Sequence, residues 1–99
     1  MNLHDLPVVP QGQEAAETLL ESGAVRIERI VSRGASTGWY DQTESEFVTL
    51  LTGEAVIEYG DGSRAELRAG DTLFILPHRR HRVVRTTSDP PCVWLCVFF

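Results

Sequence analysis

The chain has 99 residues, which is room for one domain with one hydrophobic core. Hydrophobic residues make up 42% and charged residues 23%, proportions that are ordinary for a globular domain and exclude a disordered chain. The net charge of −5 and the pI of about 5.0 exclude a general nucleic-acid binder, so any basic function must be local.

The N-terminal part of the chain divides into an arm and a candidate helix. Residues 1–12 contain two prolines and a glycine, which favour an extended arm. Residues 13–23, QEAAETLLESG, are rich in helix formers, and Gly23 stands where a helix would end. The sequence therefore predicts one short helix here.

From Ala24 onward, short runs of β-branched and aromatic residues alternate with turn residues. The runs are AVRIERIVS (24–32), EFVTLL (46–51), AVIEY (55–59), RAELR (64–68), TLFIL (72–76), RVVRTT (82–87) and CVWLCVFF (92–99). The GDG at 60–62 predicts a hairpin. Many short strands with regular turns predict an all-β sandwich or small barrel over residues 24–99.

Two observations concern the compartment in which the protein works. No apolar run approaches the roughly 20 residues that span a bilayer, and the first residues do not resemble a secretory signal. Cys92 and Cys96 lie four residues apart, roughly 13 Å along a strand, which is too far for a disulfide. We therefore expect buried free thiols, a cytoplasmic location and no membrane partner.

Gly34, Tyr40, Gln42, Glu46 and Gly53 follow one another at intervals of six, two, four and seven residues. This spacing resembles the first motif of the cupin superfamily, G-x5-H-x-H-x(3,4)-E-x6-G. Gly34, Glu46 and Gly53 occupy the glycine, glutamate and glycine positions. Tyr40 and Gln42 stand where the motif has its two histidines.

A second segment resembles the second cupin motif, G-x5-P-x-G-x2-H-x3-N. Gly70 and His81 fall at its glycine and histidine positions, and Pro77 stands one place beyond its proline position. His78 replaces the inner glycine, and Arg85 replaces the asparagine.

The surrounding sequence is similar to that of small, mostly uncharacterised single-domain bacterial cupins. The similarity lies in LLESGAVRIERIVSRG, GWYDQTESEFVTLLTGEAVIEYGDG and RAGDTLFILPHRRHRV, within residues 14–99. The resemblance implies one cupin domain over residues 1–99. It also implies a double-stranded β-helix, or jelly-roll barrel, with the ligand site inside the barrel mouth.

The resemblance also implies a metal centre, since cupin motifs bring three histidines and a glutamate around Zn, Fe, Ni or Mn. By position, Glu46 and His81 are retained, and Gln42 stands in for the second histidine. If the gap before the glutamate is one residue longer, Trp39 and Asp41 fill the histidine positions. A carboxylate from Asp41 would bind a transition ion better than a neutral amide.

Strand alternation bears on this choice. On a regular strand Tyr40, Gln42 and Glu46 share one face and Asp41 points away, but a bulge would reverse this. His78 is either an added imidazole ligand at the mouth or a solvent-exposed turn residue.

Alternation also sorts the basic segment ILPHRRHRVVR (75–85). Arg85 shares parity with His81, so we expect it inside the barrel, where it pairs with Glu46 or clamps an anion. Trp39 and Tyr40 either wall the pocket or pack in the core. No aromatic residues interleave the arginines, so we expect no nucleic-acid partner.

The last run, CVWLCVFF, is apolar on both faces, which predicts a homodimer. The first functional hypothesis is a cupin that binds a divalent metal and a small anionic ligand, with the question of catalysis and its reaction left open. The alternative is a metal-free binding or regulatory module without catalysis, in which Arg85, Tyr40 and Gln42 hold the ligand. A dimeric scaffold without a cavity is the third.

Overall fold

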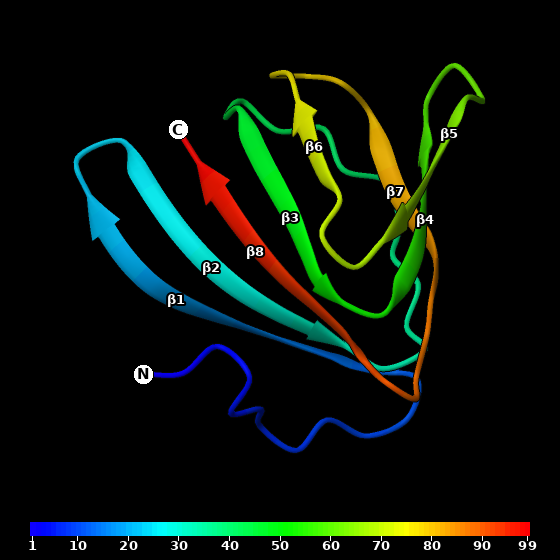
Figure 1. Ribbon diagram of the computed structural model, residues 1–99. Helices are drawn as coiled ribbons and strands as arrows, with labels where there is room; N and C mark the ends of the chain where they lie inside the picture. The colour runs from blue at the N-terminus through cyan, green and yellow to red at the C-terminus, as the bar shows by residue number, and fades with distance from the viewer.

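The computed structural model describes residues 1–99 as eight β-strands in two facing sheets, with no helix (Figure 1). The strands are β1 (Glu14–Ser22), β2 (Val25–Ser32), β3 (Glu46–Thr52), β4 (Glu54–Tyr59), β5 (Arg64–Arg68), β6 (Thr72–Ile75), β7 (His81–Thr86) and β8 (Cys92–Phe98). The structure contains no helix that is long and apolar enough to cross a membrane.

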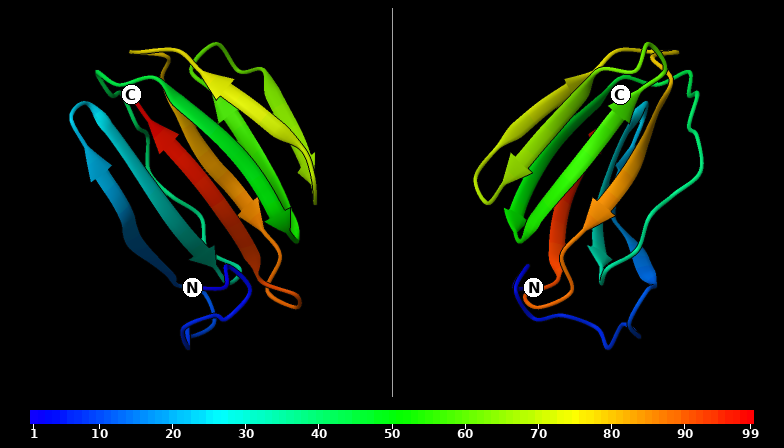
Figure 2. Two further views of the ribbon diagram at one scale, coloured as in Figure 1. Left: turned by 60° about the vertical axis from the view of Figure 1, so that its left-hand side comes forward. Right: turned by 90° about the vertical axis from the view of Figure 1, so that its right-hand side faces the viewer.

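The large sheet has the strand order β1-β2-β8-β3-β6 and the small sheet the order β5-β4-β7. All pairs are antiparallel, and the two views in Figure 2 show the sheets stacked face to face. The all-β jelly-roll prediction is confirmed, and each predicted run from residue 24 onward lies on one strand. The predicted hairpin at 60–62 joins β4 to β5.

The predicted helix over residues 13–23 is wrong, because this segment is the edge strand β1. It pairs along its length with β2, from Glu14 opposite Ser32 to Ser22 opposite Val25. Intrinsic helix preference amounts to less than about 1 kcal/mol per residue, so the pairing and the packing of alternate side chains override it. The barrel consequently begins at residue 14 rather than at residue 24.

A core of apolar side chains fills the space between β3, β4 and β8. Its largest fully buried members include Leu50, Ile75 and Val48. Gly53 joins β3 to β4 with a φ of 88°, and a Cβ there would lie 2.8 Å from the Cys92 sulfur. This close approach explains why the turn carries glycine. Cys92 and Cys96 are buried and free, as expected.

The N-terminal arm lies against the outer face of the large sheet. Arg29 on β2 is only 3% exposed, and its guanidinium donates hydrogen bonds to the backbone carbonyls of Asn2, Leu3 and Asp5. The same guanidinium pairs with Glu17 on β1. One buried cation therefore fastens the arm to the sheet.

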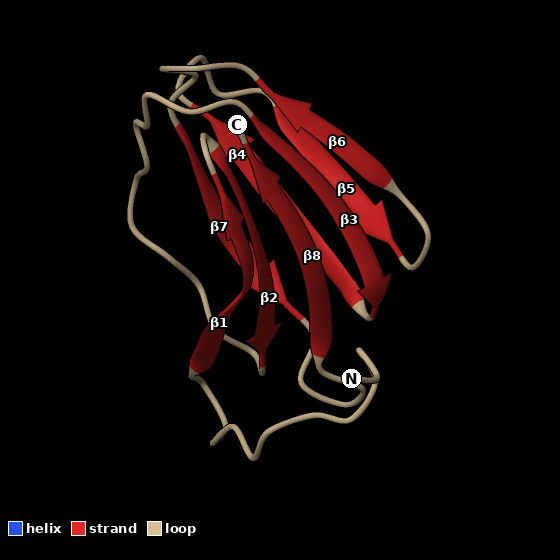
Figure 3. Cartoon of the chain, turned by 90° about the vertical axis from the view of Figure 1, so that its left-hand side faces the viewer, coloured by secondary structure: helices blue, strands red, loops and turns tan.

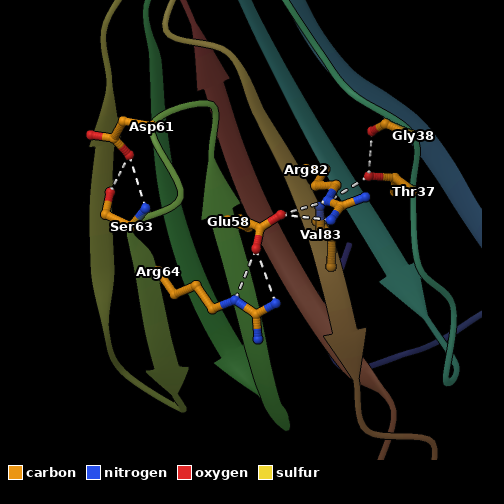
Figure 4. Close-up of polar contacts among 8 residues, drawn as sticks. All are labelled: Thr37, Gly38, Glu58, Asp61, Ser63, Arg64, Arg82 and Val83. Atoms are coloured by element: carbon orange, nitrogen blue, oxygen red, sulfur yellow. Dashed lines mark hydrogen bonds and ion pairs between the residues drawn. The ribbon is translucent and has the colours of Figure 1, made fainter.

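The outer faces of the two sheets differ in character. On the small sheet, Glu58 lies between Arg64 and Arg82 and pairs with both (Figure 4). The large sheet instead carries a row of apolar side chains in register across all five strands. The members of this outer apolar row, from β1 to β6, are Leu20, Ile27, Val97, Phe47 and Phe74.

Candidate functional site

A pocket of about 280 Å³ lies between the sheets. Figure 3 shows the connection between β2 and β3 running along β7, on the side where β1 forms the edge of the large sheet. Residues from β1 and from this connection line the pocket together. Its apolar lining includes Ile30, Val48, Ile57, Ile75, Val83, Trp94 and Phe98. The volume lies just below the range of about 300–1,000 Å³ that is typical of ligand sites.

Glu46 and His81 meet at the polar end of the pocket. Glu46 comes from β3 in the large sheet and His81 from β7 in the small sheet, and both are buried. Glu46 Oε1 and His81 Nε2 lie 4.0 Å apart, which is too far for a hydrogen bond. Gln42 Nε2 instead donates a 3.0 Å hydrogen bond to Glu46 Oε1.

Burial raises the pKa of Glu46 above its ordinary value. The hydrogen bonds from Gln42 and the Cys96 thiol, and the neighbouring His81, work in the opposite direction without overcoming the burial. Cys96 also faces the pocket, where burial and the charge of Glu46 raise the pKa of its thiol far above the usual range. Cys96 is therefore a neutral hydrogen-bond donor, since a nucleophile would need to be a thiolate.

His81 is oriented by the backbone. Its Nδ1 lies 2.8 Å from the carbonyl oxygen of Arg79, and a carbonyl can only accept, so Nδ1 carries the hydrogen. In the neutral imidazole, Nε2 then presents its lone pair to the pocket. The ring also packs against Tyr40, with 5.6 Å between the ring centroids.

Tyr40 is held beside His81 by two backbone hydrogen bonds between the residues, of 2.7 and 3.1 Å. Burial, followed by the charges of Glu14 and Glu46, raises the pKa of the Tyr40 hydroxyl. The Tyr40 hydroxyl therefore lies within the electrostatic reach of the carboxylates that line the pocket.

Two groups of lining residues were not anticipated from the sequence. Arg26 on β2 donates to Glu28 at 2.7 Å and to Glu44 at 2.8 Å, and its guanidinium lies 4.3 Å from the centre of the Phe98 ring. The alternation of residues in RIERIVS (26–32) is the sequence signal that could have revealed Arg26 and Glu28 as lining residues. It places Arg26 and Glu28 on the same strand face as Ile30.

The second group is a chain of hydrogen bonds at the other end of the pocket. Trp94 Nε1 donates to Ser32 Oγ at 3.1 Å, and Ser32 Oγ donates to Glu14 Oε2 at 3.2 Å. Glu14 begins the strand that the sequence predicted to be a helix, so its place in the barrel was hidden.

Asp41 and His78 lie outside the pocket and pair with each other. Their side chains are 60% and 64% exposed, and His78 Nδ1 lies 2.7 Å from Asp41 Oδ1. His78 adopts a φ of 62°, the left-handed conformation that its motif position normally reserves for glycine. This position fits the interpretation of His78 as a solvent-exposed turn residue rather than as an added metal ligand at the mouth.

The expectation that Arg85 points into the barrel is wrong. The pairing of β4 with β7 shifts register, because Val56 faces Arg85 whereas the next residue, Ile57, faces Val83. The extra residue, Val84, breaks the alternation, so Arg85 is exposed while His81 and Val83 line the pocket.

Trp39 also lies outside the pocket. Its ring stacks with the guanidinium groups of Arg80 and Arg82, at 4.3 and 4.5 Å from the ring centre. The structure thus brings Glu46, His81, Gln42 and Tyr40 together, and leaves Asp41, His78, Arg85 and Trp39 outside. The chemical roles of the first group stay predictions.

These residues do not form a complete transition-metal site. Structural and catalytic sites for such ions take three or four strong donors from the protein. Glu46 and His81 are two, and no three His, Cys, Asp or Glu side chains are grouped so as to hold a metal. Gln42 directs its amide nitrogen, a donor that cannot bind a cation, toward the glutamate.

The family model of the cupin domain matches residues 27–98, so the chain belongs to the cupin family. A protein of Ralstonia eutropha, provisionally assigned as a mannose-6-phosphate isomerase, has a similar solved structure. The two are 38% identical, with a TM-score of 0.90, over 99% of this chain and 94% of the Ralstonia chain.

Two further structures show the same fold at lower identity. A cupin superfamily protein of Desulfitobacterium hafniense is 21% identical, with a TM-score of 0.81, over 94% of this chain and 83% of its own. The TT1209 protein of Thermus thermophilus is 21% identical, with a TM-score of 0.82, over 99% of this chain and 93% of its own. None of the curated proteins compared with the chain matches it.

Proposed function

We propose that the protein binds a small molecule inside its barrel and does so without a resident metal. The pocket supports this proposal, since an apolar lining surrounds a few converging polar groups, as in most ligand sites. One observation carries the metal-free part. The residue at a motif histidine position, Gln42, donates a hydrogen bond to Glu46 instead of offering a strong metal ligand.

A divalent transition metal held by Glu46 and His81 is the competing function. The observation that favours it is the convergence of these two strong donors from opposite sheets, 4.0 Å apart. A third ligand would have to come from Gln42 or from a rearranged neighbour, since Asp41 and His78 pair at the surface.

The provisional assignment of the Ralstonia protein raises the question of a sugar phosphate as ligand. Such a ligand needs a cation or several free donors for its phosphate. Arg26 is the one arginine that lines the pocket, and Glu28 and Glu44 already hold its guanidinium. This argues against a phosphate ester.

Elemental analysis of freshly purified protein tests the proposal. We expect far less than one equivalent of metal per chain, and no thermal shift with Zn, Mn, Ni or Fe. A library of small fragments is expected to raise the melting temperature through the pocket. One retained equivalent that is lost in both Glu46→Ala and His81→Ala would establish the metal site. His4→Ala is the matched control, because His4 lies exposed in the arm.

A further inference from the structure

The polar groups that face the pocket are mostly hydrogen-bond acceptors. Glu14, Glu28 and Glu46 bring three carboxylates to its lining, from β1, β2 and β3. Ser32 donates to Glu14, Arg26 donates to Glu28, and Gln42 and the Cys96 thiol donate to Glu46. A carboxylate has about four lone-pair sites, so acceptor capacity remains at each.

His81 adds an independent acceptor that has no partner in the chain. The side chain is only 6% exposed, and its Nδ1 hydrogen is used on the Arg79 carbonyl. Its Nε2 lines the pocket without any hydrogen bond, and the nearest polar group, Glu46 Oε1, lies 4.0 Å away. An acceptor that faces the pocket in this state favours a ligand that donates.

Most donor side chains among the lining residues already have an acceptor in the protein. Arg26 gives its hydrogens to Glu28 and Glu44, Gln42 donates to Glu46, and Trp94 donates to Ser32. An anionic ligand would therefore compete with protein carboxylates for most of these donors. A ligand that donates would displace none of them.

The charges point in the same direction. Three lining carboxylates face one guanidinium, which is also shared with Glu44 outside the lining. The rings of Tyr40 and Trp94 line the same space, and their electron-rich faces attract cations. An ammonium group carries three donors and no acceptor, which complements this arrangement.

We infer that the ligand is a small organic cation, an ammonium group on an apolar body, attracted by the negative charge of Glu14, Glu28 and Glu46 and accepted by the Nε2 atom of His81. This inference rests on the proposed function, because it names the ligand class of the same pocket. It replaces the small anionic ligand expected from the sequence, for which Arg85 was the intended partner and lies outside.

Three probes of one shape test the inference: benzylamine, which is protonated at neutral pH, benzyl alcohol and benzoate. Calorimetric titration near pH 7 is expected to show benzylammonium binding at least about tenfold more tightly than benzyl alcohol, with benzoate weakest. If benzoate or benzyl alcohol binds as tightly as benzylammonium, the inference of a cationic ligand is wrong and the proposal of a small-molecule pocket is retained. If none of the three binds, both proposals are wrong.

Variants locate the effect in the pocket. Glu14→Gln lies at the exposed start of β1 and is expected to fold normally, yet to weaken benzylammonium binding by about threefold to tenfold. Glu28→Gln should act similarly, whereas benzyl alcohol binding should stay nearly constant in both. Glu66→Gln is the matched control, because Glu66 is exposed on β5, outside the pocket. Equal weakening in this control would overturn the assignment to Glu14 and Glu28.

Discussion

Glu46 Oε1 and His81 Nε2 face each other across 4.0 Å from opposite sheets, and neither serves as the hydrogen-bond partner of the other. Gln42 holds the carboxylate and the Arg79 carbonyl holds the imidazole. Both groups are thus fixed in place while keeping a free side toward the pocket. Such preorganisation favours binding, because little side-chain freedom remains to be lost.

The buried charge of Glu46 should lower stability at neutral pH. Its pKa is raised above the ordinary value of 4.5, so the folded protein binds this proton more tightly than the unfolded chain does. The stabilisation is complete below the unfolded pKa and is lost as the pH rises through the raised folded pKa. We expect Glu46→Gln to be more stable than the wild type near pH 7, and this advantage to shrink toward about pH 4.

Urea denaturation midpoints across this pH range measure the effect. Glu66→Gln is the control, since its carboxylate is exposed on β5 and should show no comparable trend. A Glu46→Gln protein that is less stable than the wild type at pH 7 would show that the neighbouring groups compensate the charge.

Replacing Arg29 should release the N-terminal arm. Arg29→Met removes the donors to three backbone carbonyls and leaves Glu17 without its cation, so we expect a loss of about 2–4 kcal/mol in the free energy of unfolding. Hydrogen exchange should then become fast in residues 1–5. Arg64→Ala removes an exposed arginine from the small sheet and should barely move the midpoint.

The surface position of His78 can be tested by restoring the glycine of the motif. We expect His78→Gly to fold and to gain up to about 1 kcal/mol of stability, because the left-handed φ of 62° is unstrained for glycine. Thermal melts check the stability, and the fragment titrations check the pocket. A loss of ligand or metal binding in this variant would show that His78 takes part in the site.

We expect two copies of the chain to associate through the outer apolar row. Phe47 and Phe74 lie opposite each other on adjacent strands of the large sheet, and they are 41% and 45% exposed. Phe47→Glu should therefore shift the protein from dimer to monomer in analytical ultracentrifugation. Val56→Glu, on the outer face of the small sheet, should remain a dimer, and a monomeric wild type at about 100 μM would refute the expectation.

The seven strands β2 to β8, the motif positions and the meeting of Glu46 with His81 were predictable from the sequence and its resemblance to cupins. Strand periodicity and the spacing of glycines are local signals, and Gly53 lies where the motif places it. The failure at β1 has a different cause. The residues of Glu14–Ser22 favour a helix by composition, yet as a strand they half-bury alternate side chains. Only the pairing with β2 decides between a helix and a strand here.

Arg85 shows the limit of counting along a strand. A bulge adds one residue to a strand without a recognisable signal in the sequence. Every residue after Val84 therefore lies on the opposite face of β7 from the one that simple alternation predicts. Arg26, Glu28 and Glu14 were missed because the motifs do not include them. Their shared pocket follows only from the packing of the two sheets.

The two tryptophans of the chain differ sharply in their surroundings. Trp94 is 4% exposed and lines the pocket, whereas Trp39 is 37% exposed and stacks on arginines outside it. The tryptophan fluorescence of a Trp39→Phe variant would come from the pocket wall alone. The barrel therefore contains its own optical reporter, which would register the arrival of any ligand as a change in emission without an attached dye.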